Sequence, residues 1–290
     1  MSMRQRIAAV VMLFAVLAIF CCASEAAGTL KMPNNLQVIG EQAFYGDRSL
    51  DKVVLPSGVR EIRAKAFANS SLKEIFLPNS LTWIADDAFD KPEKVTIRAN
   101  AGTYAYLWAA AHGYLSATPT EGLVFESYGN KYYVTGYEGQ DANVIIPAQK
   151  DGYPVTGIAD CAFMWNYRIS NVVVPNGVTY IGYEAFSNCT GLTGIFLPDS
   201  LTTINANAFK ACSRLRSVTI PSGVETISSE TFYSCISLRG VTIPDTVTTI
   251  GSKAFYNCPN LIIKTTAGSA TEAYAQKYKL NYEIIPAESK

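Results

Sequence analysis

Cysteines return at a fixed interval in the second half of the chain, where their thiols could ligate a metal or form disulfides. Each stands three residues after a phenylalanine: Cys189, Cys212, Cys235 and Cys258. A structural zinc site needs four ligands that converge on one point. A disulfide needs Cβ atoms about 3.5 to 4.5 Å apart. Residues repeated along stacked coils point in parallel and stay about 5 Å apart, so neither chemistry fits.

Other units carry small polar residues at the same position, such as Asp47 and Asn166. A side chain there can bond to backbone groups at a bend. We therefore expect a buried column of reduced thiols. Cys161 brings the number after the N-terminal segment to five, and an odd number cannot all pair within one chain.

Residues suited to catalysis are few. The single histidine, His112, falls in a segment expected to be helical, where packing or solvation explains it. Carboxylates that could form an acid–base pair stand at variable positions in turns: Asp86, Asp87, Asp160, Glu184 and Glu230. No Gly-rich phosphate loop, H-E-x-x-H or C-x-x-C motif is present. We predict that the protein is not an enzyme and has no catalytic, cofactor-binding or metal-ligating residues.

The composition describes a folded chain with no overall electrostatic preference. Of the 290 residues, 49% are hydrophobic, and 24 Lys and Arg balance 24 Asp and Glu. Such a chain can bury a substantial core. Its zero net charge does not favour nucleic acid or an anionic membrane surface, so partners must be recognised by local features.

The N-terminus has the layout of a secretory signal. Arg4 and Arg6 precede an apolar run over 7–22, and small residues follow, with cleavage expected near Ala26. The run is shorter than the roughly 20 residues of a spanning helix, and no later segment could span a bilayer. We predict a protein that is secreted or held at the cell surface.

A lipid anchor is the alternative for this segment. Lipidation of Cys21 or Cys22 would attach the mature chain to a membrane. The residue before the first of them is Phe20, whereas a lipoprotein signal requires a small residue there. The sequence therefore favours cleavage without lipidation.

A repeat of 22 or 23 residues organises the rest of the chain. Its isoleucine anchor falls at Ile39, Ile62, Ile84, Ile158, Ile181, Ile204, Ile227 and Ile250. A phenylalanine keeps the same interval at Phe44, Phe67, Phe89, Phe163, Phe186, Phe209, Phe232 and Phe255. Units of 20 to 29 residues rich in Leu, Ile and Val are typical of leucine-rich repeats, in which each coil buries its apolar edge against its neighbours.

Each unit contains one segment that reads as a short strand. In residues 72–77 apolar side chains alternate with others, so Leu72, Ile75 and Leu77 should point inward. Lys73, Glu74 and Phe76 should then lie on the exposed face. The Ala-Phe pair that follows should turn the chain back, with the phenylalanine filling the core.

Two segments, 95–114 and 261–280, depart from the repeat and align with each other without a gap. Each segment is expected to form a strand, a turn and a helix, and Trp108 of the first aligns with Tyr274 of the second. Ser269 and Glu272 predict a capping box. Ala270, Ala273, Tyr274 and Tyr278 are expected to share the apolar face of the second helix. Such helices can cover the open end of a solenoid.

These features predict the organisation of the chain. A signal peptide occupies 1–26, and a first leucine-rich repeat stack with a cap helix occupies 27–118. A hairpin over 119–143 opens the second stack, because residues 123–139 alternate on both sides of Tyr-Gly-Asn. A second stack with its own cap helix follows over 144–290. The first stack has no such starter, so its leading edge is expected to be open to self-association.

The units resemble those of the BspA-like leucine-rich repeat proteins of bacterial and some protist cell surfaces, which read C-x-x-L-x-x-I-x-I-P-x-x-V-x-x-I-x-x-x-A-F. The eight Ala-Phe or Thr-Phe closures and the C-terminal helix both fit. The resemblance implies a solenoid of short parallel strands. It also implies adhesion and binding of host proteins as the functions to consider.

The candidate binding face is the exposed side of the strands. Its middle column is expected to contain Val54, Phe76, Thr96, Val173, Phe196, Thr219 and Thr242, flanked by Lys73 and Glu74. Aromatic residues of this kind are favoured in interfaces. Arg216 and Arg239 stand one coil apart, with Arg214 nearby, and could hold an anionic group; a solvated basic rim is the alternative.

The favoured function is therefore that of an exported recognition module that binds an extracellular protein or glycan. A self-associating scaffold of the cell envelope is the alternative.

Overall fold

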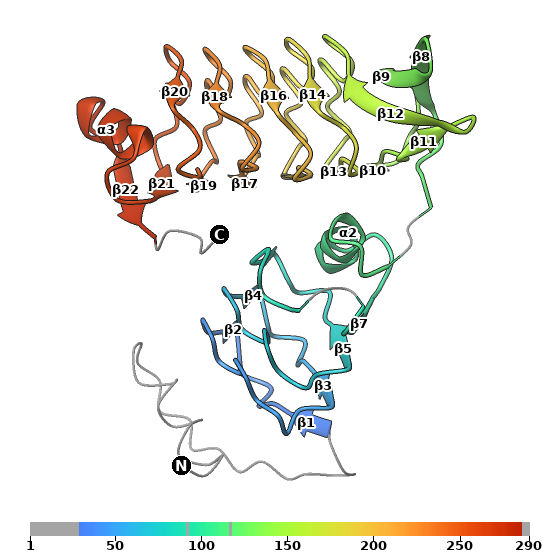
Figure 1. Ribbon diagram of the computed structural model, residues 1–290, viewed down its shortest axis with the longest axis vertical. Coiled ribbons are helices and arrows are strands. Elements are labelled where there is room, and N and C mark those ends of the chain that lie inside the picture. The colour runs from blue at the N-terminus through green and yellow to red at the C-terminus, as the bar shows by residue number, and fades with distance from the viewer. Residues whose placement is uncertain (1–28, 91–92, 116–117, 286–290) are drawn as a thin grey trace. The chain divides into compact units, whose positions relative to one another are not determined.

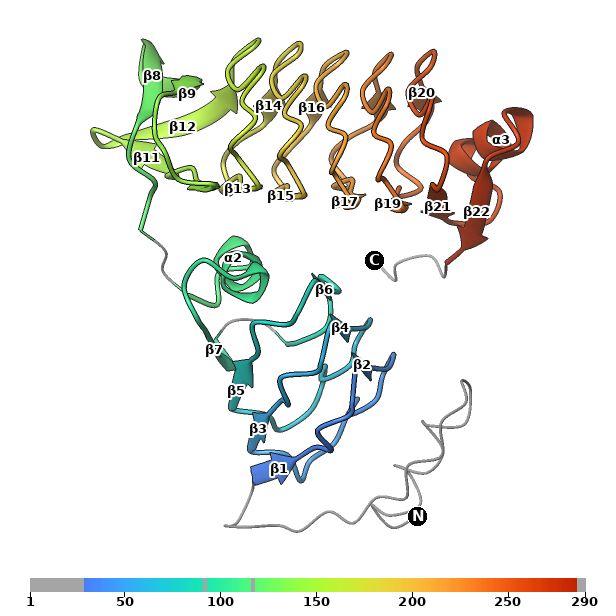
Figure 2. The ribbon, with the colours of Figure 1, turned by 180° about the vertical axis from the view of Figure 1, so that it is seen from behind.

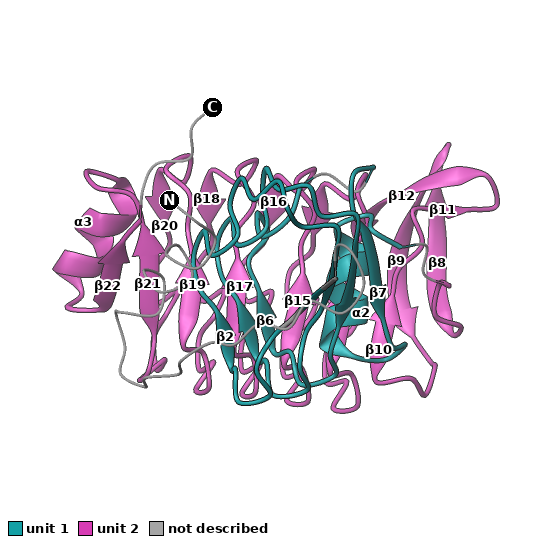
Figure 3. Ribbon diagram, turned by 90° about the horizontal axis from the view of Figure 1, so that it is seen from below, with its two compact units in different colours: residues 1–116 teal, residues 117–290 magenta. Residues whose placement is uncertain are grey.

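A computed structural model describes residues 29–90, 93–115 and 118–285. The expected signal peptide over 1–26, with Cys21 and Cys22, lies outside these residues. The chain divides into two compact units, 1–116 and 117–290 (Figure 3). Each is a solenoid of short parallel strands (Figure 1). The predicted leucine-rich repeat solenoid is confirmed.

The first unit consists of two narrow parallel sheets and a helix. One sheet has the order β1 (Thr29–Lys31), β3 (Lys52–Val54), β5 (Glu74–Leu77), β7 (Thr96–Ala99). The other has the order β2 (Val38–Ile39), β4 (Glu61–Ile62), β6 (Trp83–Ile84). The helix α2 (Tyr104–Ala111) follows the last strand. The first three coils thus contribute one strand to each sheet, and their interior lies between the sheets.

The second unit begins with an antiparallel hairpin of β8 (Leu123–Tyr128) and β9 (Lys131–Tyr137). Two smaller strands follow, β10 (Asn143–Ile145) and β11 (Gln149–Lys150), and then β12 (Tyr153–Ile158), which pairs in parallel with β9. These strands form one end of the unit, and the helix α3 (Ala270–Lys277) forms the other (Figure 2).

Between these ends the strands of the coils lie on two faces of the solenoid. The face that carries the predicted strands contains β13 (Asn171–Val173), β15 (Gly194–Phe196), β17 (Ser217–Thr219), β19 (Gly240–Thr242) and β21 (Ile262–Thr265). The other contains β14 (Tyr180–Ile181), β16 (Thr203–Ile204), β18 (Thr226–Ile227) and β20 (Thr249–Ile250), in one sheet with β12, β9 and β8. Within the repeats, only the strands of the first face are predictable from alternation in the sequence, because those of the other face contain two residues each.

The repeated phenylalanines stack on one another inside both units. Neighbouring rings in the second unit are nearly parallel and stacked, with centroids 4.9 to 5.5 Å apart from Phe163 to Phe255. In the first unit Phe44, Phe67 and Phe89 repeat this at 5.2 and 5.3 Å. Most of these rings are fully buried. The predicted core position of the phenylalanine is confirmed.

The turns around seven of the eight repeated phenylalanines each contain two residues in the left-handed region. The first of the two residues lies two positions before the phenylalanine: it is Gln42, Lys65, Cys161, Glu184, Asn207, Glu230 or Lys253. The second lies two positions after the phenylalanine: it is Gly46, Asn69, Trp165, Asn188, Ala211, Ser234 or Asn257. Between them the backbone bonds to the next coil, as where the Phe44 N–H donates to the Ala66 oxygen at 2.7 Å. This ladder of hydrogen bonds fixes the spacing of the coils.

The helices α2 and α3 close the phenylalanine stacks. Trp108 lies 5.7 Å from Phe89 and Tyr274 lies 6.3 Å from Phe255, centroid to centroid. The alignment of the two cap segments in the sequence is thus reproduced in space. The strand β22 (Asn281–Ile284), which sequence analysis did not anticipate, then pairs with β21 and extends the sheet beyond α3.

Two details of α3 differ from expectation. The Glu272 carboxylate accepts from the Gly268 N–H at 2.7 Å, one residue before the predicted capping-box partner, while Ser269 Oγ accepts from the Glu272 N–H as expected. The face toward the core is formed by Thr271 and Ala275, whereas Ala270, Ala273 and Tyr278 are exposed. Of the predicted apolar face, Tyr274 packs against the core, and the prediction was wrong for Ala270, Ala273 and Tyr278.

Candidate binding surface

An apolar centre lies on the strand face of the first unit. Val54 and Phe76 are paired between β3 and β5, and they are 42% and 37% exposed. The residues on either side of each in the strand are buried, including Val53 and Ile75 at 0% exposure. Alternation therefore places Val54 and Phe76 together on the outer side.

Charged side chains surround this centre. Lys52 Nζ lies 2.9 Å from Glu74 Oε2, and the Arg98 guanidinium contacts the other carboxylate oxygen of Glu74. Lys73 Nζ lies 2.8 Å from Asp51 Oδ1. The hydrogen bonds from Lys52 and then from Arg98 lower the pKa of Glu74, and the bond to Asp51 raises the pKa of Lys73. The apolar pair is thus bordered by fixed charges of both signs.

The register corrects one member of the predicted column. Thr96 pairs with Glu74, and Arg98 pairs with Phe76. In the cap segment the inward positions Val95 and Ile97 are two residues apart, whereas ordinary units such as 72–75 have three. The strand of the cap segment therefore has one residue fewer between its inward positions. As a result Arg98, and not Thr96, lies beside Phe76 in the exposed column. Lys52 and Arg98 were missed as site residues, and the shorter spacing was the signal for the second.

The strand face of the second unit differs from expectation at Val173. This residue is only 4% exposed, so its assignment to the exposed column was wrong. It pairs with Ile145 on one side and with Phe196 on the other. Two large neighbours about 5 Å away on the same face cover a small side chain between them. Phe196 is half-buried, and the column continues with the paired Thr219 and Thr242.

Two arginines flank the threonines. The backbone N–H of Arg239 donates to the Arg216 oxygen at 2.9 Å, so the two residues occupy the same place on successive coils. Both side chains are exposed, as is that of Arg214. None of the ion pairs between described residues involves Arg216 or Arg239. Their guanidinium groups are available to solvent and to a ligand.

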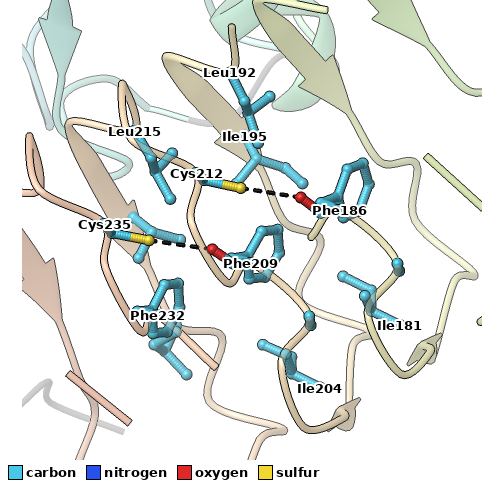
Figure 4. Packing of buried hydrophobic residues seen from close by; sticks show 14 of the residues in the cluster. Ile181, Phe186, Leu192, Ile195, Ile204, Phe209, Cys212, Leu215, Phe232 and Cys235 are labelled. Atoms are coloured by element: carbon cyan, nitrogen blue, oxygen red, sulfur yellow. Dashed lines mark hydrogen bonds between the residues drawn. The ribbon is translucent and has the colours of Figure 1, made fainter. Parts of the chain in front are cut away.

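The cysteine column has a structural arrangement. Each buried thiol donates to the carbonyl oxygen of a phenylalanine one coil earlier, as from Cys212 to Phe186 and from Cys235 to Phe209, both at 3.1 Å (Figure 4). All five described cysteines are free, and only Cys161 is exposed. Burial raises the pKa of Cys189 to about 12 and that of Cys258 to about 11. The predicted inward-facing donors are confirmed.

The remaining candidate groups have partners in the turns. His112 stacks on Trp108 at 4.2 Å, and its Nε2 lies 3.1 Å from Asp86 Oδ1. Asp87 accepts from the Lys65 N–H at 3.3 Å. Asp160 accepts from the Tyr183 N–H at 2.7 Å, and Glu230 pairs with Lys210 at 2.8 Å. Asp160, Glu184 and Glu230 lie on different coils.

The fold and this repeated face define a leucine-rich repeat protein. A sequence profile for the BspA type leucine rich repeat region, in six copies, matches residues 18–103 and 154–281. The chain therefore belongs to the BspA type leucine-rich repeat family. No curated protein matches the chain. Within the described residues, no helix combines the length and apolar character that crossing a membrane requires.

Several solved structures are similar. A leucine rich repeat protein of T. pallidum is 34% identical, with a TM-score of 0.49, over 51% of this chain and 71% of that one. A leucine rich cell surface protein of Faecalibacterium prausnitzii is 28% identical, with a TM-score of 0.47, over 86% of this chain and 62% of its own. The pneumococcal vaccine antigen PcpA is 18% identical, with a TM-score of 0.46, over 90% and 68%.

Proposed function

We propose that the chain is an exported, non-enzymatic recognition module that binds an extracellular protein through the strand face of its solenoid. The observation that carries the proposal is the exposed pair Val54 and Phe76, bordered by the ion pairs of Glu74 with Lys52 and Arg98. Protein interfaces concentrate their binding energy in a small apolar centre with aromatic anchors, inside a polar rim.

In the second unit the same role falls to Phe196, Thr219 and Thr242, with Arg216 and Arg239 as a basic border. A solenoid repeats one surface position on each coil, so an extended partner can contact several coils at once. Export is supported by Arg4, Arg6 and the apolar run of the N-terminal segment. The Faecalibacterium protein is described as a cell surface protein, which supports the same location here.

A non-enzymatic role is supported by how the candidate acid groups are used. Asp160 and Glu230 are bound by neighbouring coils, and His112 packs on Trp108. These groups stabilise the turns of the repeat through their hydrogen bonds, ion pairs and ring contacts. The proposal therefore assigns no catalytic residue.

The test uses a chain that begins at residue 27. Extracellular proteins captured by it are identified by mass spectrometry, and the affinity of each is measured for Phe76→Ser and Phe196→Ser. Both variants should keep the circular dichroism of the parent and lose at least about tenfold in affinity. Val124→Ser is the matched control, because Val124 is 38% exposed and lies on the hairpin strand β8. Equal binding by all variants would refute the assignment of the face.

A scaffold function is the second candidate, and β1 is the observation that favours it. Among the described strands, β1 is the last in its sheet and pairs on one side only, with β3. An edge of this kind can pair with another chain. Light scattering at high protein concentration distinguishes the two functions: a monodisperse monomer excludes self-assembly, and concentration-dependent growth that a proline at Leu30 abolishes supports it.

A further inference from the structure

A row of aromatic and polar side chains crosses the opposite face of the second unit. The strands β8, β9, β12 and β14 place Glu126, Tyr133, Gly157 and Tyr180 side by side in register. The residues next to them, Val134, Ile158 and Ile181, are fully buried. The row therefore faces outward from the sheet that the proposed protein-binding face does not use.

Tyr133 forms the floor of this row. A Cβ at Gly157 would lie 2.4 Å from Cε1 of Tyr133, so the ring can lie on the backbone of β12 only because residue 157 is glycine. Tyr128 and Tyr180 stand steeply to Tyr133, at 75° and 66°, with centroids 5.3 and 6.2 Å away. The three rings make a floor with two walls, and Tyr128 is 53% exposed.

Hydrogen-bonding groups of both kinds surround the rings. The Tyr180 hydroxyl donates to Asp160 Oδ1 at 3.2 Å and accepts from Asn205 Nδ2 at 2.8 Å. Lys131 Nζ lies 5.7 Å from the centre of the Tyr133 ring. A carboxylate has about four acceptor positions and an ammonium has three donors. Asp160, Glu126 and Lys131 therefore keep capacity for a ligand beyond the bonds they make.

We propose that Tyr128, Tyr133 and Tyr180 form a glycan-binding site for a β-1,4-linked oligosaccharide of gluco configuration. Such a sugar has equatorial substituents, so its axial C–H groups form a flat apolar surface on each side of the ring. The electron-rich face of an aromatic ring attracts these slightly positive hydrogens. Its hydroxyl groups donate and accept, which matches the mixture of carboxylate, amide, phenol and ammonium groups around the row.

The charges argue against the other occupants. A purely apolar partner would have to desolvate Glu126, Asp160 and Lys131 without replacing their hydrogen bonds to water, which is unfavourable. A cationic ligand would compete with the Lys131 ammonium that already lies over Tyr133. A neutral polyhydroxyl ligand must also displace the Lys131 ammonium from the Tyr133 ring, but its hydroxyl groups can accept hydrogen bonds from that ammonium and it meets no charge repulsion.

Isothermal titration calorimetry with cellotetraose and with N-acetylchitotetraose tests the site in the chain that begins at residue 27. The parent should bind at least one of them with a dissociation constant of about 1 mM or below. Tyr128→Ala and Tyr180→Ala should each weaken binding about tenfold or more, whereas Tyr128→Phe keeps the ring and should stay within about threefold. Tyr153→Ala is the matched control, because Tyr153 is 49% exposed and lies outside the row.

Absence of binding of both sugars to the folded parent would overturn the proposal, as would equal binding by Tyr128→Ala and Tyr153→Ala. Tyr128 is exposed, so its variants remain informative even if the Tyr180 variant fails to fold. Phe76→Ser and Phe196→Ser should bind the sugars like the parent, because they lie on the other face. A failure of the glycan site therefore leaves the protein-binding proposal standing, and the reverse is also true.

Discussion

The thiol of Cys212 donates a hydrogen bond of 3.1 Å to the carbonyl oxygen of Phe186 in the preceding coil. This relationship repeats from Cys189 to Phe163 and from Cys258 to Phe232. The Phe186 carbonyl also accepts from the Cys189 N–H at 3.1 Å, and its second lone pair, buried at a turn away from water, needs a further donor. The cysteine meets this need with a small side chain that is otherwise apolar, which explains why the residue type returns with the period of the repeat.

Stability should fall in alkaline solution because of these thiols. Burial raises the pKa of Cys189 to about 12 and that of Cys258 to about 11, whereas an unfolded thiol titrates near 8.5. The stabilisation is complete below pH of about 8.5 and is lost as the pH rises toward the folded values, by up to about 1.4 kcal/mol per pH unit for each thiol. Urea unfolding between pH 8 and pH 10 measures this loss.

The control is a Cys189→Ser, Cys258→Ser double variant, whose hydroxyls do not titrate in that range. Its free energy of unfolding should depend less on pH than that of the parent. An equal pH dependence of the free energy of unfolding in the two proteins would contradict the role given to these two thiols. In the native chain at pH 8, Cys161 alone among the five should react with a thiol reagent, since the other four are buried.

The burial of Val173, which was predicted to be exposed on the strand face, can be tested by mutation. Val173 is 4% exposed, and Thr219, one of the exposed residues of the strand face, is open to solvent. Val173→Ser should therefore reduce the free energy of unfolding by about 1 to 3 kcal/mol through lost burial and a buried hydroxyl. Thr219→Ser should change it by less than about 0.5 kcal/mol. Equal effects in denaturant titrations would contradict the observed burial.

The repeat was predictable because one period controls every strongly buried position. Ile181, Phe186 and Leu192 each recur after 23 residues, as Ile204, Phe209 and Leu215, and all six are buried. The second sheet was not predictable, because its strands contribute two residues each and follow from coil stacking. The same holds for β22, whose four residues are all exposed and show no alternation of burial.

The sites depend on relationships between coils that a single unit does not reveal. Arg98 reaches the column of Phe76 because the cap segment is one residue shorter before its strand. Tyr133 reaches the face of Gly157 because β9, from the hairpin, pairs in parallel with β12. Both depend on strand register, which the repeat period does not specify where a unit is irregular.

The ion pairs on the strand face should make the first unit sensitive to acid. Hydrogen bonds from Lys52 and Arg98 lower the pKa of Glu74. A lowered folded pKa means that the contribution of Glu74 is present above its unfolded value, near pH 4.3, and is lost as the pH falls through the folded value. Thermal unfolding between pH 6 and pH 3 should show a weaker pH dependence for Glu74→Gln than for the parent. Glu61→Gln is the comparison, because the Glu61–Arg63 contact is 3.5 Å long, and a similar effect there would argue against a special role for Glu74.

Trp165 should be an unfavourable residue for the fold. It adopts φ of 65° at the position two residues after Phe163, where other units use Gly46, Asn188 or Asn257. Left-handed backbone costs a bulky side chain more than it costs asparagine or glycine, and the Trp165 ring is 53% exposed, so it recovers little through burial. Trp165→Asn should therefore raise the free energy of unfolding by about 0.5 to 1 kcal/mol, measured by urea denaturation. Tyr167→Ala provides the control for loss of the edge contact between the two rings, whose centroids are 6.2 Å apart. If Trp165→Asn is less stable than the parent while Tyr167→Ala is unchanged, the ring contributes packing that outweighs the backbone cost. If it is more stable, the tryptophan is retained against the preference of the turn, and its exposed ring becomes the next candidate for a contact with a partner.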